Sequence, residues 1–341
     1  MTDCAPRESW GVNRFVSRRR FIGIGVIVVA LAATFISYQL RKPVLWEWRG
    51  LIFGSEASIL LTAPPGADIG ALFHECSAEA RRLESIFTLY DVDSQLRRLN
   101  RDGVLQNPAP ELVELLRLSQ EAHKVTSGAF DPTVQSLWEL YRDHFEKNLD
   151  DTQGPAAADL EAARAKIGFE HIQINDDEIR FNREGMSLTL NGIAQGYVTD
   201  KIAEILMGRG IENALVNIGE FRAMGVDLDG QPWVVGIAMP DVPGQLLDAI
   251  KLRNSALATS GGYGFRFDSA GGFHHLFHPH EARFNSATRS VSVEHPSAAW
   301  ADALATAGSV IDKAALENLV KSTANAEFRI YEANEATEIE D

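Results

Sequence analysis

Asp302 and Thr306 bring a carboxylate and a hydroxyl into a stretch, residues 297–311, that is otherwise rich in Ala and Leu. That composition predicts a helix, and residues four apart share one helix face. Both groups are hard oxygen donors, so with a backbone carbonyl they could hold Mg²⁺ and leave positions open for water and a phosphate. An ordinary Ala-rich core helix with one acid near its start is the favoured interpretation of this stretch on its own.

Four histidines form a second cluster, at His274, His275, His278 and His280. Neutral imidazole is a common ligand of Zn²⁺ and related metals. No Cys accompanies these histidines, and Pro279 prevents the segment from presenting one regular face. The local pattern leaves a metal site and a polar loop as alternatives.

Two shorter segments could contact a ligand. Ser260, Gly261 and Gly262 could offer backbone N–H groups to a phosphate, or could form an ordinary tight turn. Residues 129–131 follow Gly128. They could place the Phe130 ring and the Asp131 carboxyl at a ligand, or they could form a turn with the Phe130 ring in the core. The chain has no GxGxxG, P-loop, HExxH or GxSxG motif, so nothing marks a Rossmann dinucleotide site, an ATPase, a zincin protease or a serine hydrolase.

Both helices and strands are predicted to position these residues. Apolar periodicity and helix end signals predict helices over 67–90, 94–100, 108–127, 159–166 and 297–311, and residues 191–200 lead into a helix that runs through residue 207. Strands are predicted over 53–62, 172–174, 178–181, 186–190, 214–218, 226–229, 233–238, 249–252 and 291–293. Residues 175–177 should form the turn of a hairpin.

Charge is unevenly distributed along the 341 residues, whose net charge is −15. Residues 1–50 hold eight basic and three acidic residues, which leaves 24 basic and 44 acidic residues in the remainder. Such an acidic body argues against a nucleic-acid partner, because phosphates need a basic surface. The only cysteines, Cys4 and Cys76, lie on either side of the apolar segment described next, so no disulfide framework is expected within the body.

The amino terminus resembles a bacterial export signal. Residues 17–22 read Ser-Arg-Arg-Arg-Phe-Ile, the pattern of a twin-arginine signal, and the uncharged run 21–40 is long enough to cross a bilayer. Residues 30–32 offer a small-residue cleavage site, so a cleaved signal and a retained anchor are both open. We expect residues 1–45 to direct the chain to the bacterial periplasm and to keep it anchored in the inner membrane.

Taken together, the body resembles the ApbE family of FAD:protein FMN transferases. The matching segments follow the family's order and span roughly residues 53–311. They are 87–90 with 94–100, 128–134, 191–197 with Asp200, 216–219, 258–261 with Tyr263, 274–276 and 302–306. Each segment is weak alone, but seven in order make a specific match.

The resemblance implies an α+β fold of two intimately packed subdomains, of the ApbE/T-fold-like type, over residues 46–330, followed by an acidic tail at 331–341. It implies Mg²⁺-dependent transfer of FMN from FAD to a Ser or Thr hydroxyl of a target redox protein of a membrane or periplasmic electron-transfer system, with AMP leaving. On this resemblance, the metal ligands are Asp302, Thr306 and the backbone oxygen of Gly192. His275 or its neighbour His274 falls near the transferring phosphate. The FAD-contacting positions are Tyr90, Ala129, Phe130, Asp131, Gln195, Ser260, Gly261, Leu276 and Ala305.

This chain departs from the family pattern at several nucleotide contacts. Gln195 stands where Lys is common, Thr189 where Asp is usual, and Glu220 where a second Gly often follows Gly219. Residues 278–282 replace an Asp-Pro-x-Thr-Gly turn. Because the metal-ligand positions are kept and only some nucleotide contacts differ, an active transferase is the leading hypothesis. The alternatives are a degenerate member that binds FAD as an accessory protein of a respiratory complex, and a His-cluster metal protein without a flavin role.

Overall fold

The computed structural model describes residues 42–239, 242 and 244–332. Of the described residues, 45–63 and those from 68 onward belong to one compact unit, and 42–44 with 64–67 belong to another. The predicted export signal or anchor lies almost entirely outside the described residues, as does most of the acidic tail. Among the described residues, no helix is both long and apolar enough to cross a membrane.

A seven-stranded sheet is the centre of the larger unit, with the strand order β1-β2-β6-β7-β10-β11-β12. Its ladders from β2 to β12 are antiparallel. The strands are β1 (Val44–Ile52), β2 (Ser55–Ala63), β6 (Ala214–Asn217), β7 (Phe221–Met224), β10 (Ala256–Gly261), β11 (Ser290–His295) and β12 (Glu327–Tyr331). The hairpin of β8 (Trp233–Ala238) and β9 (Leu246–Leu252) packs its apolar side chains against Leu215, Ala223 and Leu257 of this sheet.

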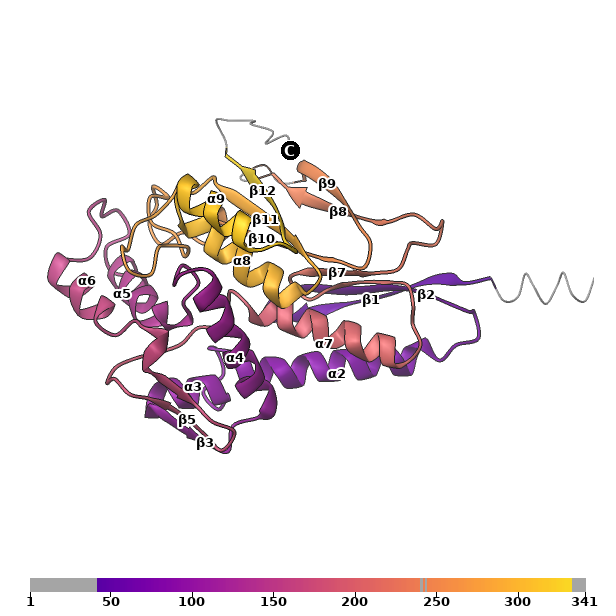
Figure 1. Cartoon of the computed structure of the whole chain (residues 1–341), viewed down its shortest axis with the longest axis horizontal. Helices are drawn as coiled ribbons and strands as arrows, with labels where there is room; N and C mark the ends of the chain where they lie inside the picture. Colours follow the sequence, from indigo (N-terminus) through magenta and orange to yellow (C-terminus); the bar gives the residue numbers. More distant parts are fainter. Residues whose placement is uncertain (1–41, 240–241, 243, 333–341) are drawn as a thin grey trace, which may run out of the picture. The chain divides into compact units, whose positions relative to one another are not determined.

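Helices α2 (Ile69–Phe87), α7 (Ala194–Gly208) and α8 (Ala298–Val310) lie close to one another beside the main sheet (Figure 1). The α8 helix packs against β10, β11 and α7, and it is buried along nearly its whole length. Asp200 of α7 fixes the start of α8, because its carboxylate accepts the Ala298 and Ala299 N–H groups at 2.9 and 3.1 Å. A carboxylate at a helix N-terminus satisfies free N–H groups and complements the helix dipole.

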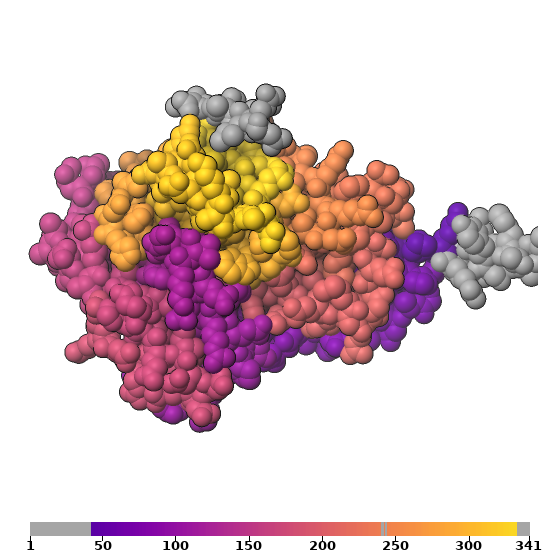
Figure 2. All heavy atoms as spheres, in the orientation of Figure 1, coloured from indigo at the N-terminus to yellow at the C-terminus, as the bar shows by residue number. Residues whose placement is uncertain are grey.

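The body also contains further helices and a three-stranded sheet. They are α3 (Gln95–Asp102), α4 (Pro110–Val125), α5 (Gln135–Phe145), α6 (Ala157–Arg164), α9 (Lys313–Ser322) and the three-stranded sheet β3 (Val104–Gln106), β5 (Glu178–Phe181) and β4 (Ile172–Ile174), with short 3₁₀ turns at Pro132–Val134, Phe169–His171 and Gly262–Gly264. In Figure 2 the purple surface of α4 adjoins the yellow surface of the C-terminal helices, in agreement with the packing of α4 on α8.

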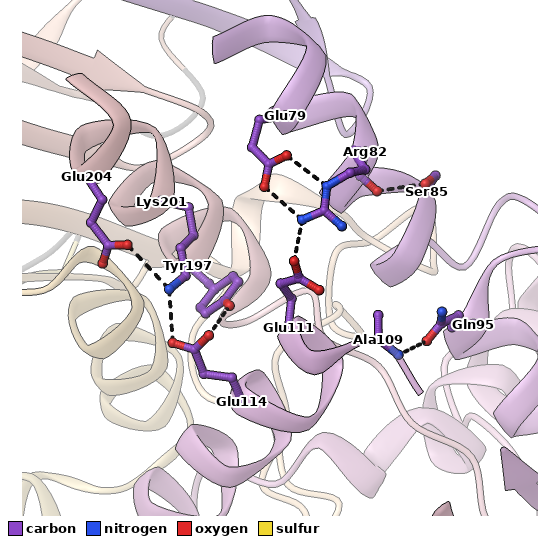
Figure 3. A network of polar contacts seen from close by, with 10 residues as sticks. All are labelled: Glu79, Arg82, Ser85, Gln95, Ala109, Glu111, Glu114, Tyr197, Lys201 and Glu204. Carbon is purple, nitrogen blue, oxygen red and sulfur yellow. Dashed lines mark hydrogen bonds and ion pairs between the residues drawn. The ribbon is translucent and has the colours of Figure 1, made fainter. Parts of the chain in front are cut away.

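A polar network joins α2, α4 and α7 (Figure 3). Glu114 of α4 accepts a hydrogen bond from the Tyr197 hydroxyl at 2.7 Å and pairs with Lys201 of α7 at 3.0 Å. Arg82 of α2 pairs with Glu79 and with Glu111 of α4. The network therefore ties the helix that leads toward residues 128–131 to the helix that begins at residue 194.

The structure confirms the mixed helix and strand composition and the α8 helix, and it corrects three local predictions. Residues 186–190 are not a strand, because both backbone groups of Leu188 bond to the Asn100 side chain, each at 2.8 Å. Residues 226–229 form a turn around Asp227, whose carboxylate accepts the Asp229 and Gln231 N–H groups, and the strand lies earlier, at β7. Ser260 and Gly261 belong to β10, so the turn begins only at Gly262.

Candidate active site

One small pocket collects residues from four separate parts of the chain. It has a volume of about 60 Å³, far below the roughly 300–1,000 Å³ usual for a small-molecule site, so a large ligand would extend beyond it. Its walls are Ala129, Phe130, Asp131, Pro132, Val134, Thr189, Gly192, His275, Leu276, Phe277, Pro279, Thr306 and Val310. Seven of the predicted site residues therefore meet here: Ala129, Phe130, Asp131, Gly192, His275, Leu276 and Thr306.

Oxygen donors gather on the side of the pocket formed by α8. The Thr306 hydroxyl lies 3.4 Å from the hydroxyl of Ser260. A Cβ atom on Gly192 would lie only 2.8 Å from Thr306 Oγ1, so only glycine leaves the backbone this close to the hydroxyl. Asp302 lies one helical turn before Thr306, is buried, and accepts the Gly196 N–H at 3.2 Å. These oxygens match the donor set that Mg²⁺ prefers.

Two carboxyl groups of this region, those of Asp302 and Glu220, lie close enough to affect each other's protonation. Burial raises the pKa of Asp302 to about 7, although the Gly196 N–H favours its charged form. Burial, and then the nearby charge of Asp302, raise the pKa of Glu220 well above its usual range. Among the described residues neither carboxylate forms an ion pair. A divalent cation would offset the repulsion between them, so the residues present fit a metal of the Mg²⁺ type.

His275 lines the pocket with a defined tautomer. Its Nδ1 atom lies 3.1 Å from the carbonyl oxygen of Phe265. A carbonyl oxygen only accepts, so Nδ1 carries the hydrogen and the neutral ring has an unprotonated Nε2. Burial lowers the pKa of His275, which keeps the ring neutral near pH 7. The Nε2 atom of His275 can therefore accept a proton.

His274 serves a different purpose. Its Nε2 atom lies 3.0 Å from the Asn285 carbonyl, and its Nδ1 atom accepts the Leu276 N–H at 3.3 Å. The ring is buried, does not line the pocket and uses both nitrogens. Of the two predicted histidines, the structure brings only His275 to the pocket.

Asp131 presents a carboxylate oxygen without a partner. Its Oδ1 atom accepts hydrogen bonds from the N–H and hydroxyl of Thr133, at 2.8 and 2.6 Å. The Oδ2 atom is buried without a hydrogen bond, and His123 Nδ1 lies 3.6 Å away. Burial raises the pKa of Asp131 against these favourable contacts. Because an unpaired buried oxygen is costly, this atom is a candidate acceptor for a ligand N–H or O–H.

Several predicted residues lie outside the pocket wall. Ser260 touches Thr306, and Gly261 is paired with Ser290 in the sheet. Ala305 is fully buried within α8. The Gln195 amide lies against Gly219, where a Cβ atom would be 2.3 Å away. Tyr90 is 88% exposed in the segment between α2 and α3.

Some site residues were not predicted as such. Pro132, Val134, Phe277, Pro279 and Val310 line the pocket as apolar walls, for which the sequence carries no chemical signal. Glu220 and Thr189 were noted only as departures from a family pattern. Glu220 accepts the Thr259 N–H of β10, and α8 with Asp302 packs on that strand, so the two carboxyl groups meet only through tertiary packing, which local patterns do not encode.

The histidine cluster does not converge. Among the described residues, no three His, Cys, Asp or Glu side chains come together as a metal-binding group. The rings of His278 and His280 have centroids 6.2 Å apart, while His274 is bonded to Asn285. The alternative of a metal protein built on these four histidines is therefore wrong in this structure.

Comparisons with known proteins agree with one another. A profile of the ApbE family matches residues 53–330. An FAD:protein FMN transferase of Vibrio cholerae is 31% identical over 288 residues, covering 82% of this chain and 85% of the relative. One of Haemophilus influenzae is 28% identical, covering 83% and 85%. Among solved structures, the flavin transferase ApbE from Vibrio cholerae has a TM-score of 0.70 at 26% identity, covering 85% of this chain and 97% of that one. The ApbE protein from Thermotoga maritima has a TM-score of 0.74 at 26% identity, covering 84% and 94%.

Proposed function

We infer that this chain, which belongs to the ApbE family, is an FAD:protein FMN transferase like the relatives that it matches over most of their length. This inference rests on one observation, which is that three kinds of chemical group line the same pocket. Oxygen donors for a cation lie at Thr306 and Gly192, a neutral imidazole lies at His275, and an unsatisfied carboxylate oxygen lies at Asp131.

Asp302, Thr306 and the Gly192 backbone would hold Mg²⁺. When bound, the ion would neutralise charge on the pyrophosphate of FAD, which an otherwise acidic protein cannot do with its own side chains. The carboxyl groups of the buried Asp302 and the half-buried Glu220 support this assignment, because their desolvation raises the pKa of each and a bound cation would favour the charged form of both.

The transfer step needs an in-line arrangement and a proton acceptor. The Ser or Thr hydroxyl oxygen of the target forms a bond to the phosphorus of the FMN half. The bond from that phosphorus to the oxygen shared with AMP breaks, and AMP leaves with that oxygen. The hydroxyl proton passes to Nε2 of His275, which the bond from Nδ1 to Phe265 leaves unprotonated.

The chain is proposed to act in the bacterial periplasm on a flavoprotein of a membrane or periplasmic electron-transfer system. The twin-arginine pattern at residues 17–22 and the apolar run 21–40 support this location. Fractionation of cells that express the chain with Arg18 and Arg19 both changed to Lys tests it. Loss of the protein from the periplasmic face is expected, and unchanged export would contradict the proposal.

Transfer itself is tested with an arrayed library of Ser- and Thr-containing peptides, incubated with the purified body, FAD and Mg²⁺. Covalent flavin fluorescence on a subset of peptides, absent without Mg²⁺, is the expected result. Matched peptides with Ala at the acceptor position are the control. A protein that binds FAD but labels no peptide would favour the flavin-binding accessory function instead.

A further inference from the structure

The segment that holds His275 also carries an exposed aromatic side chain. Residues 265–275 fold back on themselves, with a bridge between Arg266 and His274 and with the His275 N–H donating to the Phe265 carbonyl at 3.1 Å. Phe265 is 47% exposed, although a Phe side chain is usually buried. In Figure 1 the orange loops that carry this segment lie beside α5.

Neighbouring aromatic side chains hold the Phe265 ring in place. It lies against the ring of Trp138 of α5, with centroids 5.9 Å apart and planes 32° apart, and it meets Phe267 edge-on at 5.3 Å. The guanidinium of Arg142 lies 5.5 Å from the centroid of the Trp138 ring. Aromatic and cation–π contacts of this kind are favourable and have preferred geometries, so they hold these side chains in a defined arrangement. We call Phe265, Trp138 and Arg142 the aromatic ledge.

The aromatic ledge adjoins the imidazole of His275, the proposed proton acceptor. The Phe265 carbonyl accepts both the backbone N–H and the Nδ1–H of His275, and Gly264 packs on the same imidazole, where a Cβ atom would lie 3.3 Å from the ring. An extended chain advances about 3.3–3.6 Å per residue. An acceptor segment that runs from His275 toward Phe265 would therefore bring the two or three residues beside the hydroxyl to the exposed Phe265 ring.

We propose that the aromatic ledge docks the target protein, by packing against an apolar side chain within three residues of the acceptor Ser or Thr. This proposal rests on the proposed transferase function, because a protein acceptor must lie against the surface around His275. The occupant is thus the extended acceptor segment of the target, and the ledge helps to select which hydroxyl is modified. Aromatic side chains and Arg are enriched at protein interfaces, and Trp and Arg are enriched among the residues that dominate binding.

The test uses the peptide that the arrayed library returns for the wild-type protein. Phe265→Ala should raise the KM for that peptide by about tenfold or more, since a central aromatic anchor commonly contributes that much. The affinity for FAD, measured by flavin fluorescence, should not change. Phe265→Trp should restore most of the peptide affinity, and Trp138→Ala should reproduce the loss.

Leu246→Ala is the matched control, because Leu246 is an equally apolar side chain, 62% exposed on β9. Its KM should equal that of the wild type. An unchanged peptide KM in Phe265→Ala, with transfer intact, would overturn the aromatic ledge and leave the transferase standing. A wild-type protein that labels no peptide would overturn both.

Discussion

Two adjacent histidines of this chain have separate functions because their hydrogen bonds differ. The His275 Nδ1 atom bonds to one carbonyl and leaves Nε2 for chemistry, whereas His274 uses both nitrogens and lies in the core. The sequence alone gives the same residue type twice, so it could not separate them. The distinction comes from the fold-back of residues 265–275, which turns one ring toward the pocket and the other toward Asn285.

The burial of His274 predicts a pH dependence of stability. Burial lowers the pKa of His274 in the folded protein. Below the pKa of an unfolded His, about 6.5, the unfolded chain gains a proton that the folded protein resists. The free energy of unfolding should therefore fall as the pH falls through about 6.5, and be insensitive to this residue above it.

Urea unfolding at about pH 7.5 and about pH 5.5 measures the effect. In His274→Gln, which keeps a donor for Asn285, the loss of stability between the two pH values should be smaller than in the wild type. His74→Gln, at an exposed position of α2, is the control and should keep the wild-type difference. An equal loss in His274→Gln and in the wild type would show that His274 does not carry the effect.

At the scale of elements, the contact of α7 with α8 sets the site. Gly196 in the first turn of α7 lies so close to α8 that a Cβ atom would be 2.3 Å from the Ala298 carbonyl oxygen. Its N–H bonds to Asp302, and residue 192, just before the helix, lies against Thr306. The close approach of these two helices thus places the oxygen donors together.

Gly196→Ala should therefore destabilise the protein by about 1–3 kcal/mol or more, because the added methyl group meets backbone that cannot move aside. Urea unfolding measures the change. Gly208→Ala, near the end of the same helix, is the matched control, since nothing lies within 4 Å of the added atom. That control should be neutral or stabilise slightly, because Ala is the better helix former. Equal stabilities of the two variants would contradict the close packing of α7 on α8.

Over the whole molecule, local patterns predicted the elements better than the site. The α8 helix, the β4–β5 hairpin and β8 follow directly from composition and periodicity. The strand predicted at 186–190 was wrong because a distant side chain, Asn100, takes the backbone bonds that a neighbouring strand would have taken. The resemblance to the ApbE family predicted seven of the pocket residues. The proximity of Glu220 to Asp302, in contrast, could be recognised only from the structure.

The most direct test of the transferase assignment is the ratio of AMP released to FMN attached. The wild-type protein, FAD, Mg²⁺ and a labelled peptide from the library are mixed, and both products are followed by chromatography and mass spectrometry. One AMP should appear for each peptide that gains FMN, and both should be lost when Mg²⁺ is chelated or when Asp302 is changed to Ala. AMP without modified peptide, or full activity in Asp302→Ala, would contradict the account.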